Sequence, residues 1–474
     1  MVARRKAPLW RLGVDTGGTF TDFILIEGDR RGGRGGRARV LKVLSTPENP
    51  ARAILEGVAQ LLGEMPEAGT PGARAPWGPL AGILEITHGS TVATNALLTR
   101  TGARTGLLTT AGLEDVVEIG RQNRSRLYDL YYRRPPPLVP RPLRLGVPER
   151  VGPEGEVERP LDQGALERAL ARLGRAGVGS VAISFLHSYA NPDHERRAAE
   201  AARRAGFAVS PSSRILPEYR EYERTSTTCV NAYVSPLMGR YLSELDRRLP
   251  GGRLRVMQSN GGVLSARAAG QEAVRTILSG PAGGVVGGFA AARAAGFTQA
   301  ITFDMGGTST DVSLCRGDVG FTAEAEVAGC PIRVPVIDIH TVGAGGGSLA
   351  WRDAGGALRV GPQSAGADPG PICYGRARSG RVDLGQEVTV TDAHLFLGRL
   401  DAARFLGGGL RLDLRGVEEG LARLGRALGL EPREAAEGVL RVADASMERA
   451  IRLISVERGH DPREFVLVAF GGAG

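Results

Sequence analysis

The sequence predicts an α/β protein that contains two related domains. Strand-like apolar runs alternate with helix-like segments along most of the 474 residues, which is typical of α/β units with parallel sheets. One polar segment of eight residues occurs twice, as DTGGTFTD at residues 15–22 and as DMGGTSTD at residues 304–311. Each copy lies between two apolar runs. A repeat over this distance indicates two related domains, each of which contributes one loop to a shared cleft.

Strands and helices alternate in the first part of the chain. The apolar runs around the first repeat predict two strands joined by a turn, and a third strand follows. A helix is expected over residues 49–63, and residues 82–100 predict a strand, a polar turn and a helix. Residues 104–110 predict another strand, the Pro- and Arg-rich residues 121–150 an ordered loop, and residues 180–206 a strand, a loop and a helix.

A change in composition near residues 205–215 predicts a boundary between two domains, residues 1–205 and 206–474. The second domain opens with a long helix over residues 217–248. The segment SGPAGG at residues 279–284 predicts a glycine-rich loop that opens a helix. Two further helices, at residues 415–428 and 433–457, precede an apolar strand and the final GGAG.

The composition disfavours several classes of protein. The net charge is +9, but only two of the 60 basic residues are lysines, the arginines are spread among Ala and Gly, and aromatic content is 5%; this does not suit nucleic-acid binding. The four cysteines form no CxxC pair, which disfavours a zinc or redox motif and fits a reducing cytoplasm. The leader lacks an apolar core and no long apolar run occurs, so we expect neither a signal peptide nor a membrane partner.

The repeated segment has the chemistry of a phosphate-binding loop. Adjacent glycines let backbone N–H groups converge on an anion, and threonine hydroxyls add neutral donors. The leading aspartate is suited to hold hydrated Mg²⁺, which prefers a few carboxylates and keeps its waters. Two β-hairpins with glycine turns are the alternative interpretation. Six of the eight positions are identical, namely Asp15/Asp304, Gly17/Gly306, Gly18/Gly307, Thr19/Thr308, Thr21/Thr310 and Asp22/Asp311.

Other nucleotide motifs fit less well. A P-loop needs Gly-Lys-Ser/Thr, and neither lysine of this chain follows a glycine. The segment VGAGGGS, residues 342–348, approaches a dinucleotide fingerprint but has Ser348 where the third glycine belongs.

Two DxGGTxTD loops and a late strand that ends in GGxG resemble the superfamily of sugar kinases, heat-shock ATPases and actin. A closer resemblance, over nearly the whole chain, is to the hydantoinase A/5-oxoprolinase family. It implies duplicated actin-like, ribonuclease H-like ATPase domains around a nucleotide cleft. The motifs that carry it include GVDTGGTFTD, THGSTVATNALLTRTGART, SFLHSYANPDHE, MQSNGGV, ILSGPAGGVVGG, FDMGGTSTDVSL, DIHTVGAGGGSLAW, SAGADPGPICYG and ERGHDPREFVLVAFGGAG.

The resemblance implies ATP-dependent opening of a cyclic amide of the hydantoin or 5-oxoproline type, or ATP-dependent carboxylation of a ketone. Such proteins usually work with a separate or fused B subunit, so we expect a hetero-oligomer. ATP and Mg²⁺ are the implied cofactors, with Asp15 and Asp304 as catalytic residues that hold Mg²⁺ through water. The implied nucleotide contacts are Gly17, Gly18, Thr19, Thr21, Gly306, Gly307, Thr308 and Thr310 for phosphate, and Gly471, Gly472 and Gly474 for adenosine.

Substrate contacts are expected in two other segments. THGSTVATN places His88, Ser90, Thr91 and Asn95 on a loop and helix start, where Ser90 or Thr91 is alternatively only a helix cap. In DIHTVGAGGGS, His340 follows Asp338 at a spacing that puts both on one strand face.

Three further features have competing interpretations. SGPAGG, residues 279–284, either places a helix N-terminus toward the nucleotide or is a close-packed helix start. Asp392 and His394 repeat the Asp-x-His spacing, so both pairs are either metal ligands or structural hydrogen-bond partners. Glu223 and Arg224 lie on a polar helix face that is either solvated or a contact with another domain or a partner.

The end of the sequence and the reaction class also leave alternatives. Relatives continue beyond the GGAG turn, so we expect the C-terminal part to be truncated, and activity of the chain alone is in doubt. A small-molecule kinase and a nucleotide-switched scaffold are the functional alternatives.

Overall fold

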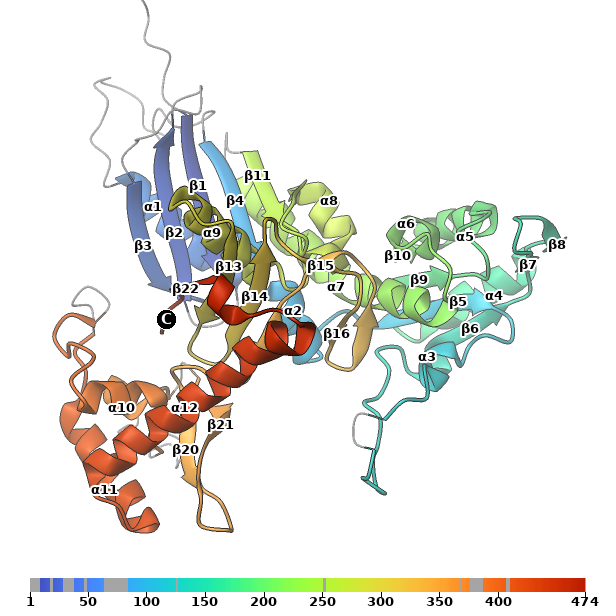
Figure 1. The fold of residues 1–474 in the computed structure, drawn as a ribbon. Helices are drawn as coiled ribbons and strands as arrows, with labels where there is room; N and C mark the ends of the chain where they lie inside the picture. The colour runs from blue at the N-terminus through green and yellow to red at the C-terminus, as the bar shows by residue number, and fades with distance from the viewer. Residues whose placement is uncertain are drawn as a thin grey trace, which may run out of the picture. The chain divides into compact units, whose positions relative to one another are not determined.

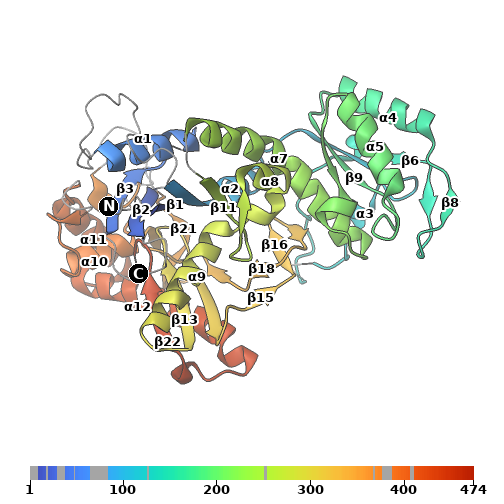
Figure 2. The same ribbon diagram turned by 90° about the horizontal axis from the view of Figure 1, so that it is seen from above.

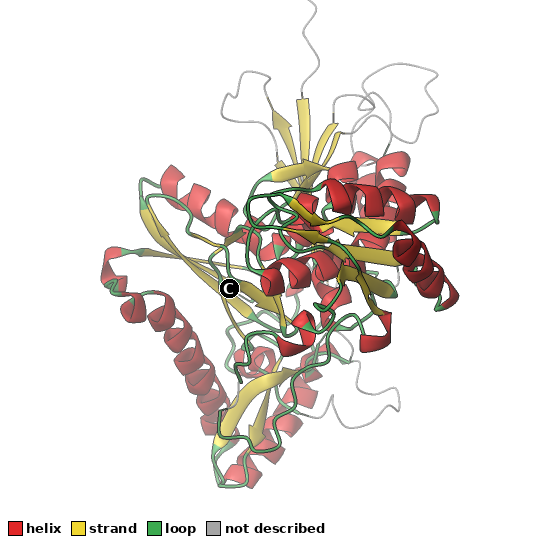
Figure 3. Cartoon of the chain, turned by 90° about the vertical axis from the view of Figure 1, so that its right-hand side faces the viewer, coloured by secondary structure: helices red, strands yellow, loops and turns green. Residues whose placement is uncertain are grey.

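The computed structural model describes residues 9–17, 20–28, 38–46, 49–63, 84–124, 127–249, 253–366, 369–375, 387–405 and 410–473. Helices and strands both occur throughout, so the protein is of the mixed α/β class (Figure 3). The chain divides into two compact units. The first consists of Met1–Gly280 and Thr322–Val336, and the second of Pro281–Phe321 and Ile337–Gly474.

A six-stranded mixed sheet carries the first repeat segment. Its order is β12-β11-β4-β1-β2-β3 (Figure 1). β1 is antiparallel to β2 but parallel to β4, which brings the carboxyl ends of β1 and β4 to the same edge. The strands are β1 (Leu9–Thr16), β2 (Phe20–Gly28), β3 (Ala38–Leu44), β4 (Leu84–Ser90), β11 (Arg253–Met257) and β12 (Val263–Ser265).

Helices α1 (Pro50–Gly63) and α7 (Glu221–Arg248) run along one face of this sheet (Figure 2). Apolar residues of α1 recur every three or four positions and pack on the inward side chains of β1 and β2. Packing is close, because a Cβ at Gly57 would overlap the ring of Phe23. Burial of this apolar face stabilises the edge from which the first repeat segment emerges.

A second sheet of the first unit is fully parallel, with the order β10-β9-β5-β6. Its strands are β5 (Thr105–Thr110), β6 (Arg144–Val147), β9 (Ser180–Ser184) and β10 (Ala208–Pro211). Helices α4 (Gln163–Arg175) and α5 (Asp193–Arg204) contribute to the same apolar core. The remaining elements of this unit are α2 (Val92–Leu98), α3 (Val116–Ile119), α6 (Ser212–Ile215), α8 (Ala266–Gln271), β7 (Arg150–Val151), β8 (Val157–Arg159), β16 (Ala325–Val327) and β17 (Cys330–Ile332), with 3-10 helices at Arg141–Leu143 and Ala273–Thr276.

The sheet of the second unit repeats the arrangement around the repeat segment. Its order is β19-β14-β13-β22, with β13 antiparallel to β14 and parallel to β22. The strands are β13 (Gln299–Met305), β14 (Thr310–Arg316), β19 (His340–Val342) and β22 (Val466–Phe470), beside the ribbon of β20 (Ser348–Arg352) and β21 (Leu358–Ser364). Its helices are α10 (Val390–Phe396), α11 (Leu414–Leu428) and α12 (Pro432–Ile454), with 3-10 helices at Ile372–Tyr374, Val456–Arg458 and Pro462–Glu464.

Three elements lie where the chain passes between the units. Helix α9 (Ser279–Ala294) crosses the point at which the first unit ends, and β15 (Phe321–Thr322) pairs with β18 (Val336–Ile337).

Most long elements agree with the sequence-based expectations. The helix predicted over residues 49–63 is α1, the one predicted over 217–248 is α7, and those at 415–428 and 433–457 are α11 and α12. Among the larger sheets of the described residues, that of β5, β6, β9 and β10 is purely parallel, whereas each repeat segment joins antiparallel strands and makes its sheet mixed. The domain division at residues 205 and 206 stays a prediction.

The loop predicted for SGPAGG is wrong, and the alternative of a close-packed helix start is confirmed. Residues 279–284 are the first turns of α9 and not a loop before it. Their glycines serve close packing, because a Cβ at Gly284 would meet Asp304 and Phe470 at 3.0 Å.

Candidate functional site

The first repeat segment is the turn of the β1–β2 hairpin. Asp15 lies opposite Asp22 across the two strands, and the N–H of Gly17 donates to the carbonyl of Phe20 at 3.0 Å. The hairpin interpretation and the phosphate-loop interpretation are therefore compatible. Gly18 and Thr19 lie outside the described residues.

The Asp15 carboxylate lies in a cradle of glycines. A Cβ at Gly89 of β4 would come within 3.0 Å of Oδ1, and one at Gly280 within 3.4 Å. Loss of hydration to the surrounding protein raises the pKa of Asp15, the Asp22 carboxylate raises it further, and Lys42 opposes both. A group in this situation gains from a nearby cation, which is what a magnesium role requires.

Hydrogen bonds from neighbouring hydroxyl and backbone groups hold the first loop. The Ser45 hydroxyl donates to the carbonyl of Gly17 at 2.8 Å and lies 3.0 Å from the hydroxyl of Thr21. The Thr91 N–H and hydroxyl both reach the carbonyl of Thr16, at 3.2 and 2.9 Å. Thr21 is fully buried, and its hydroxyl contacts Ser45, which directly follows β3, rather than solvent.

The second repeat segment has the same backbone pattern. Asp304 lies opposite Asp311 across β13 and β14, and the N–H of Gly306 donates to the carbonyl of Ser309 at 2.9 Å. Gly307 and Thr308 are exposed at the tip, as a phosphate contact would need. Thr310, like Thr21, is fully buried, and its hydroxyl donates to the carbonyl of Ala344 at 2.6 Å.

Asp304 also lies against glycines. Gly284 of α9 approaches its Oδ2, and Gly471 approaches its Oδ1 so closely that a Cβ there would overlap the carboxylate. Gly471 has φ +100°, a conformation that strongly favours glycine. Gly472 is exposed, and a Cβ added there would meet no atom within 4 Å, while Gly474 lies outside the described residues.

Sequence reasoning missed the role of VGAGGGS. Its three consecutive glycines are buried against the second loop, where the N–H of Gly346 donates to the carbonyl of Gly306 at 3.0 Å and that of Gly347 to Gly307 at 2.6 Å. A Cβ at Gly345 would come within 2.7 Å of the Gly306 carbonyl oxygen. The glycine run is therefore a backbone support for the loop, and only its poor fit to a dinucleotide motif could be read from the sequence.

The predicted substrate residues are placed differently from one another. His88 and Ser90 are buried on β4, Thr91 is the residue before α2, and the exposed Asn95 of α2 donates to the Thr91 hydroxyl at 3.3 Å. Thr91 makes no side-chain capping bond, because its hydroxyl contacts Thr16 instead. His340 begins β19, is half-buried, and shares a groove with Arg449 of α12.

The metal interpretation of the two Asp-x-His pairs finds no support. Asp338 forms an ion pair with Arg458. Asp392 is on helix α10 and not on a strand; it is fully buried and caps that helix, with Thr389 in a reciprocal pair and the N–H of Cys373 at 2.9 Å. Within the described ranges, no three His, Cys, Asp or Glu side chains cluster as a metal site would need.

Arg224 is not on a solvated face, contrary to one interpretation of its segment. It is 2% exposed, and its guanidinium donates to Ser212 at 2.7 Å, to the carbonyl of Phe185 at 2.8 Å and to Ser188. Glu223 instead pairs with Arg121 through two bonds of 2.7 Å.

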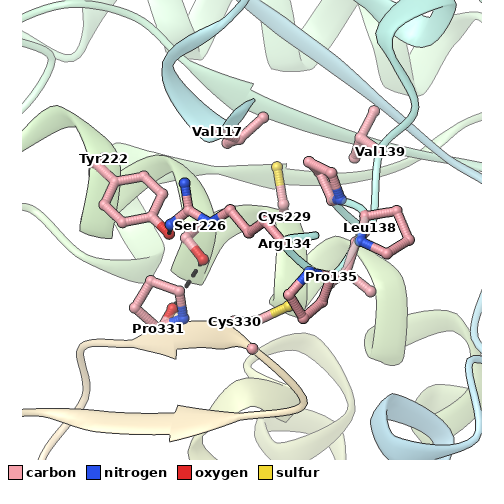
Figure 4. Close-up of a pocket in the computed structure, with 13 residues that line it drawn as sticks. Val117, Arg134, Pro135, Leu138, Val139, Tyr222, Ser226, Cys229, Cys330 and Pro331 are labelled. Atoms are coloured by element: carbon pink, nitrogen blue, oxygen red, sulfur yellow. Dashed lines mark hydrogen bonds between the residues drawn. The ribbon is translucent and has the colours of Figure 1, made fainter. Parts of the chain in front are cut away.

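A small pocket of the first unit contains two of the four cysteines, Cys229 and Cys330, beside Arg134 and Tyr222 (Figure 4). Its volume of about 30 Å³ suits little more than water. Burial raises the pKa of the Cys229 thiol to about 12 and also raises that of Cys330. Both thiols are therefore protonated near neutral pH, and neither has the character of a nucleophile.

The family of the chain follows from comparison with known proteins. A family model described as "Hydantoinase/oxoprolinase" matches residues 224–474, and one described as "Hydantoinase/oxoprolinase N-terminal region" matches residues 11–206. The chain belongs to the hydantoinase/oxoprolinase family. None of its described helices is long and apolar enough to cross a membrane.

Three similar proteins illustrate the range of this family. The alpha subunit of caprolactamase from Pseudomonas jessenii is 40% identical over 98% of this chain, and the crystal structure of that ATP-dependent enzyme matches with a TM-score of 0.80. A 5-oxoprolinase of Saccharomyces cerevisiae is 35% identical over 98% of the chain. A nucleotide-free acetone carboxylase, from work on ATP-dependent acetone carboxylation, is 30% identical over 98% of the chain with a TM-score of 0.80. The chain spans 65% of the caprolactamase subunit, 38% of the 5-oxoprolinase and 66% of the acetone carboxylase chain.

Proposed function

We propose that this chain is the ATP-binding part of an enzyme that opens a cyclic amide of the hydantoin or 5-oxoproline type. The observation that carries the proposal is the pair of matching hairpins, each with an aspartate held against glycines at the carboxyl end of its first strand. The names of the caprolactamase and 5-oxoprolinase relatives support a cyclic amide as substrate.

The proposed chemistry overcomes the poor reactivity of the amide. The carbonyl oxygen attacks the γ-phosphorus of ATP and ADP leaves. The carbon that bears the phosphorylated oxygen then accepts water. The ring C–N bond breaks as the nitrogen takes a proton, and a second water releases phosphate from the acyl phosphate. Transfer of this kind depends on positioning and on neutralisation of charge more than on a protein nucleophile.

The residues of the two hairpins take distinct parts in this proposal. Asp15 and Asp304 hold Mg²⁺ through its waters, and the ion would supply neutralisation of phosphate charge. Phosphate contacts the exposed backbone at Gly307 and Thr308 in the second loop. In the first loop it contacts Gly17 and its neighbours Gly18 and Thr19. The glycines that follow β22 contact the adenosine.

The proposal also includes the type of domain, the partner subunit and the compartment. The recurrence of an antiparallel hairpin with a parallel third strand in both units supports duplicated actin-like, ribonuclease H-like domains. A B-type subunit is the proposed partner, because the caprolactamase relative is itself named as a subunit. The four cysteines are unpaired, which suits the cytoplasm as the proposed compartment.

Carboxylation of a ketone is the second candidate, favoured by the match to acetone carboxylase at a TM-score of 0.80. Activation of an enol oxygen by ATP would use the same loops, so the reaction and not the nucleotide site distinguishes the two.

Release of ADP tests both candidates. The purified chain is assayed with Mg-ATP and hydantoin, 5-oxoproline or caprolactam, or with a ketone plus bicarbonate, in each case with and without the B-type subunit of the same organism. ADP release coupled to ring opening supports the proposal, and release only with ketone and bicarbonate supports the second candidate. A stable phosphorylated product would identify a kinase instead, and binding of ATP without turnover under every condition would identify a scaffold.

A further inference from the structure

Tyr241 of α7 reaches the strands that carry the first loop. The side chain is buried, and its hydroxyl lies 2.7 Å from Nε2 of His88 on β4. The other ring nitrogen of His88, Nδ1, lies 3.3 Å from the carbonyl of Val14 on β1. The imidazole thus links the helix to both strands just before the carboxyl edge.

The protonation of this group follows from its surroundings. His88 is 1% exposed, and burial lowers its pKa to about 4. The ring is therefore neutral near pH 7, and a carbonyl beside Nδ1 requires the single proton to be there. Nε2 is then an acceptor, so the Tyr241 hydroxyl donates to it. Burial also raises the pKa of Tyr241, which keeps that donor in place.

The inward face of β1 and β4 becomes polar toward the loop. Leu12 and Ile86 are apolar, Val14 and His88 come next, and the last inward pair is Thr16 and Ser90, each buried and next to a loop residue. The hydroxyls of Ser90 and Thr16 lie close enough to the Tyr241 oxygen to lower its pKa against the effect of burial. Thr16 Oγ1 is buried and has no hydrogen bond of good geometry among the described residues.

We infer that Tyr241 and His88 are positioning residues for the first phosphate loop: together they fix the carboxyl ends of β1 and β4, and so the place of Asp15 and Gly17. The inference rests on the proposed nucleotide role of that loop. Neither side chain would touch ATP, because both are buried on the sheet face opposite to Asp15. This role differs from the direct substrate contact that the sequence suggested for His88.

The geometry gives a reason why the polar link matters. Thr91 already ties Thr16 to the start of α2 through the backbone carbonyl, so the loop has one fixed support at the strand end. Tyr241 adds a second support, from a 28-residue helix packed in the main core. Tyr241→Phe would leave Nε2 of His88 as a buried acceptor without a donor. A shifted position of the imidazole ring would then become more favourable.

Hydrogen–deuterium exchange in the nucleotide-free protein tests the positioning directly. For Tyr241→Phe we expect exchange of peptides covering residues 14–22 to be faster by about fivefold or more, the scale of one lost hydrogen bond. Peptides covering residues 304–311 serve as the internal control and should not change. Tyr233→Phe is the matched control variant, because Tyr233 is also buried on α7 but its hydroxyl makes no hydrogen bond among the described residues.

Binding of Mg-ATP is the second measurement. We expect Tyr241→Phe to raise the Kd by about five- to tenfold and Tyr233→Phe to leave it within about twofold. His88→Gln keeps an acceptor and a donor and should retain tighter binding than His88→Leu, which keeps neither; this pair replaces Tyr241→Phe if that variant does not fold.

Two outcomes would overturn the inference. One is unchanged exchange at residues 14–22 in Tyr241→Phe and in His88→Leu, and the other is an equal change in Tyr233→Phe. Failure of the wild-type chain to bind Mg-ATP would instead count against the proposed function, while the exchange data would still decide the positioning role.

Discussion

The two repeat segments have the same strand pairing and the same turn hydrogen bond, but the groups that pack against them differ. The first loop rests on the polar side chains of Thr16, His88 and Ser90. These face Tyr241 of the long helix α7. In the second unit the position of Thr16 is taken by Met305, which packs in an apolar core with Phe303. The second loop gains its polar support from the backbone of Gly345–Gly347 instead.

The covering of the parallel neighbour strand differs as well. In the first unit α7 buries the inward face of β4. In the second unit the corresponding face of β22 is open among the described residues, with Leu467 52% exposed. The same hairpin is therefore supported by side chains in one unit and by close backbone contact in the other, so the two loops should respond differently to substitution.

The largest expected effect is common to both loops. Asp15→Asn and Asp304→Asn should each lower ATP turnover by about 100-fold or more, because each removes a charge that would hold the metal. Circular dichroism and the unfolding midpoint should stay close to those of the wild type. A double variant with full activity would refute the proposal that the loops bind Mg-ATP.

Acid should weaken the first unit through His88. The folded pKa of about 4 lies below the ordinary histidine value of 6.5, so the unfolded chain binds the proton more readily. Stability from this group is present above pH 6.5 and is lost as the pH falls toward 4, by up to about 3 kcal/mol. Urea unfolding of the wild type and of His88→Gln between about pH 7 and 4 measures the slope. A wild-type slope no steeper than that of His88→Gln would contradict a buried neutral imidazole.

Substitution of Gly471 tests whether the close packing around Asp304 requires a glycine at this position. Gly471→Ala places a Cβ against Asp304 and the Met305 carbonyl at φ +100°, and we expect a loss of about 2 kcal/mol in the free energy of unfolding. The neighbouring Gly472→Ala meets no atom within 4 Å and is the matched control. Urea denaturation of both variants measures the difference. Equal stability of the two would contradict the described packing around Asp304.

Much of this arrangement is readable from sequence, and some of it is not. The repeat identified both hairpins, since glycines and acids at fixed spacing report local backbone geometry. The supports were not identified, because His88 and Tyr241 are 153 residues apart and become neighbours only through packing. Thr21 and Thr310 look like phosphate ligands in a motif, yet their hydroxyls point inward to Ser45 and to the Ala344 carbonyl. Asp392 resembled a metal ligand for the same reason, since sequence does not show that a carboxylate already caps a helix.

The smallest expected effect concerns Thr21 and Thr310, the buried threonines at equivalent positions of the two loops. Thr21→Val and Thr310→Val each remove a buried hydroxyl with one partner, and we expect each to cost about 1 kcal/mol of unfolding free energy.

Their effects on Mg-ATP binding should differ. Thr21 loses a bond to a side chain, Ser45, which keeps its own bond to the Gly17 carbonyl, so the loop retains a support. Thr310 leaves the Ala344 carbonyl without its donor, directly before the glycine run that holds Gly306 and Gly307. Isothermal titration should therefore show a larger rise in Kd for Thr310→Val than for Thr21→Val. The reverse order would mean that the second loop does not depend on its backbone support, and the contrast between the two loops would then lie elsewhere.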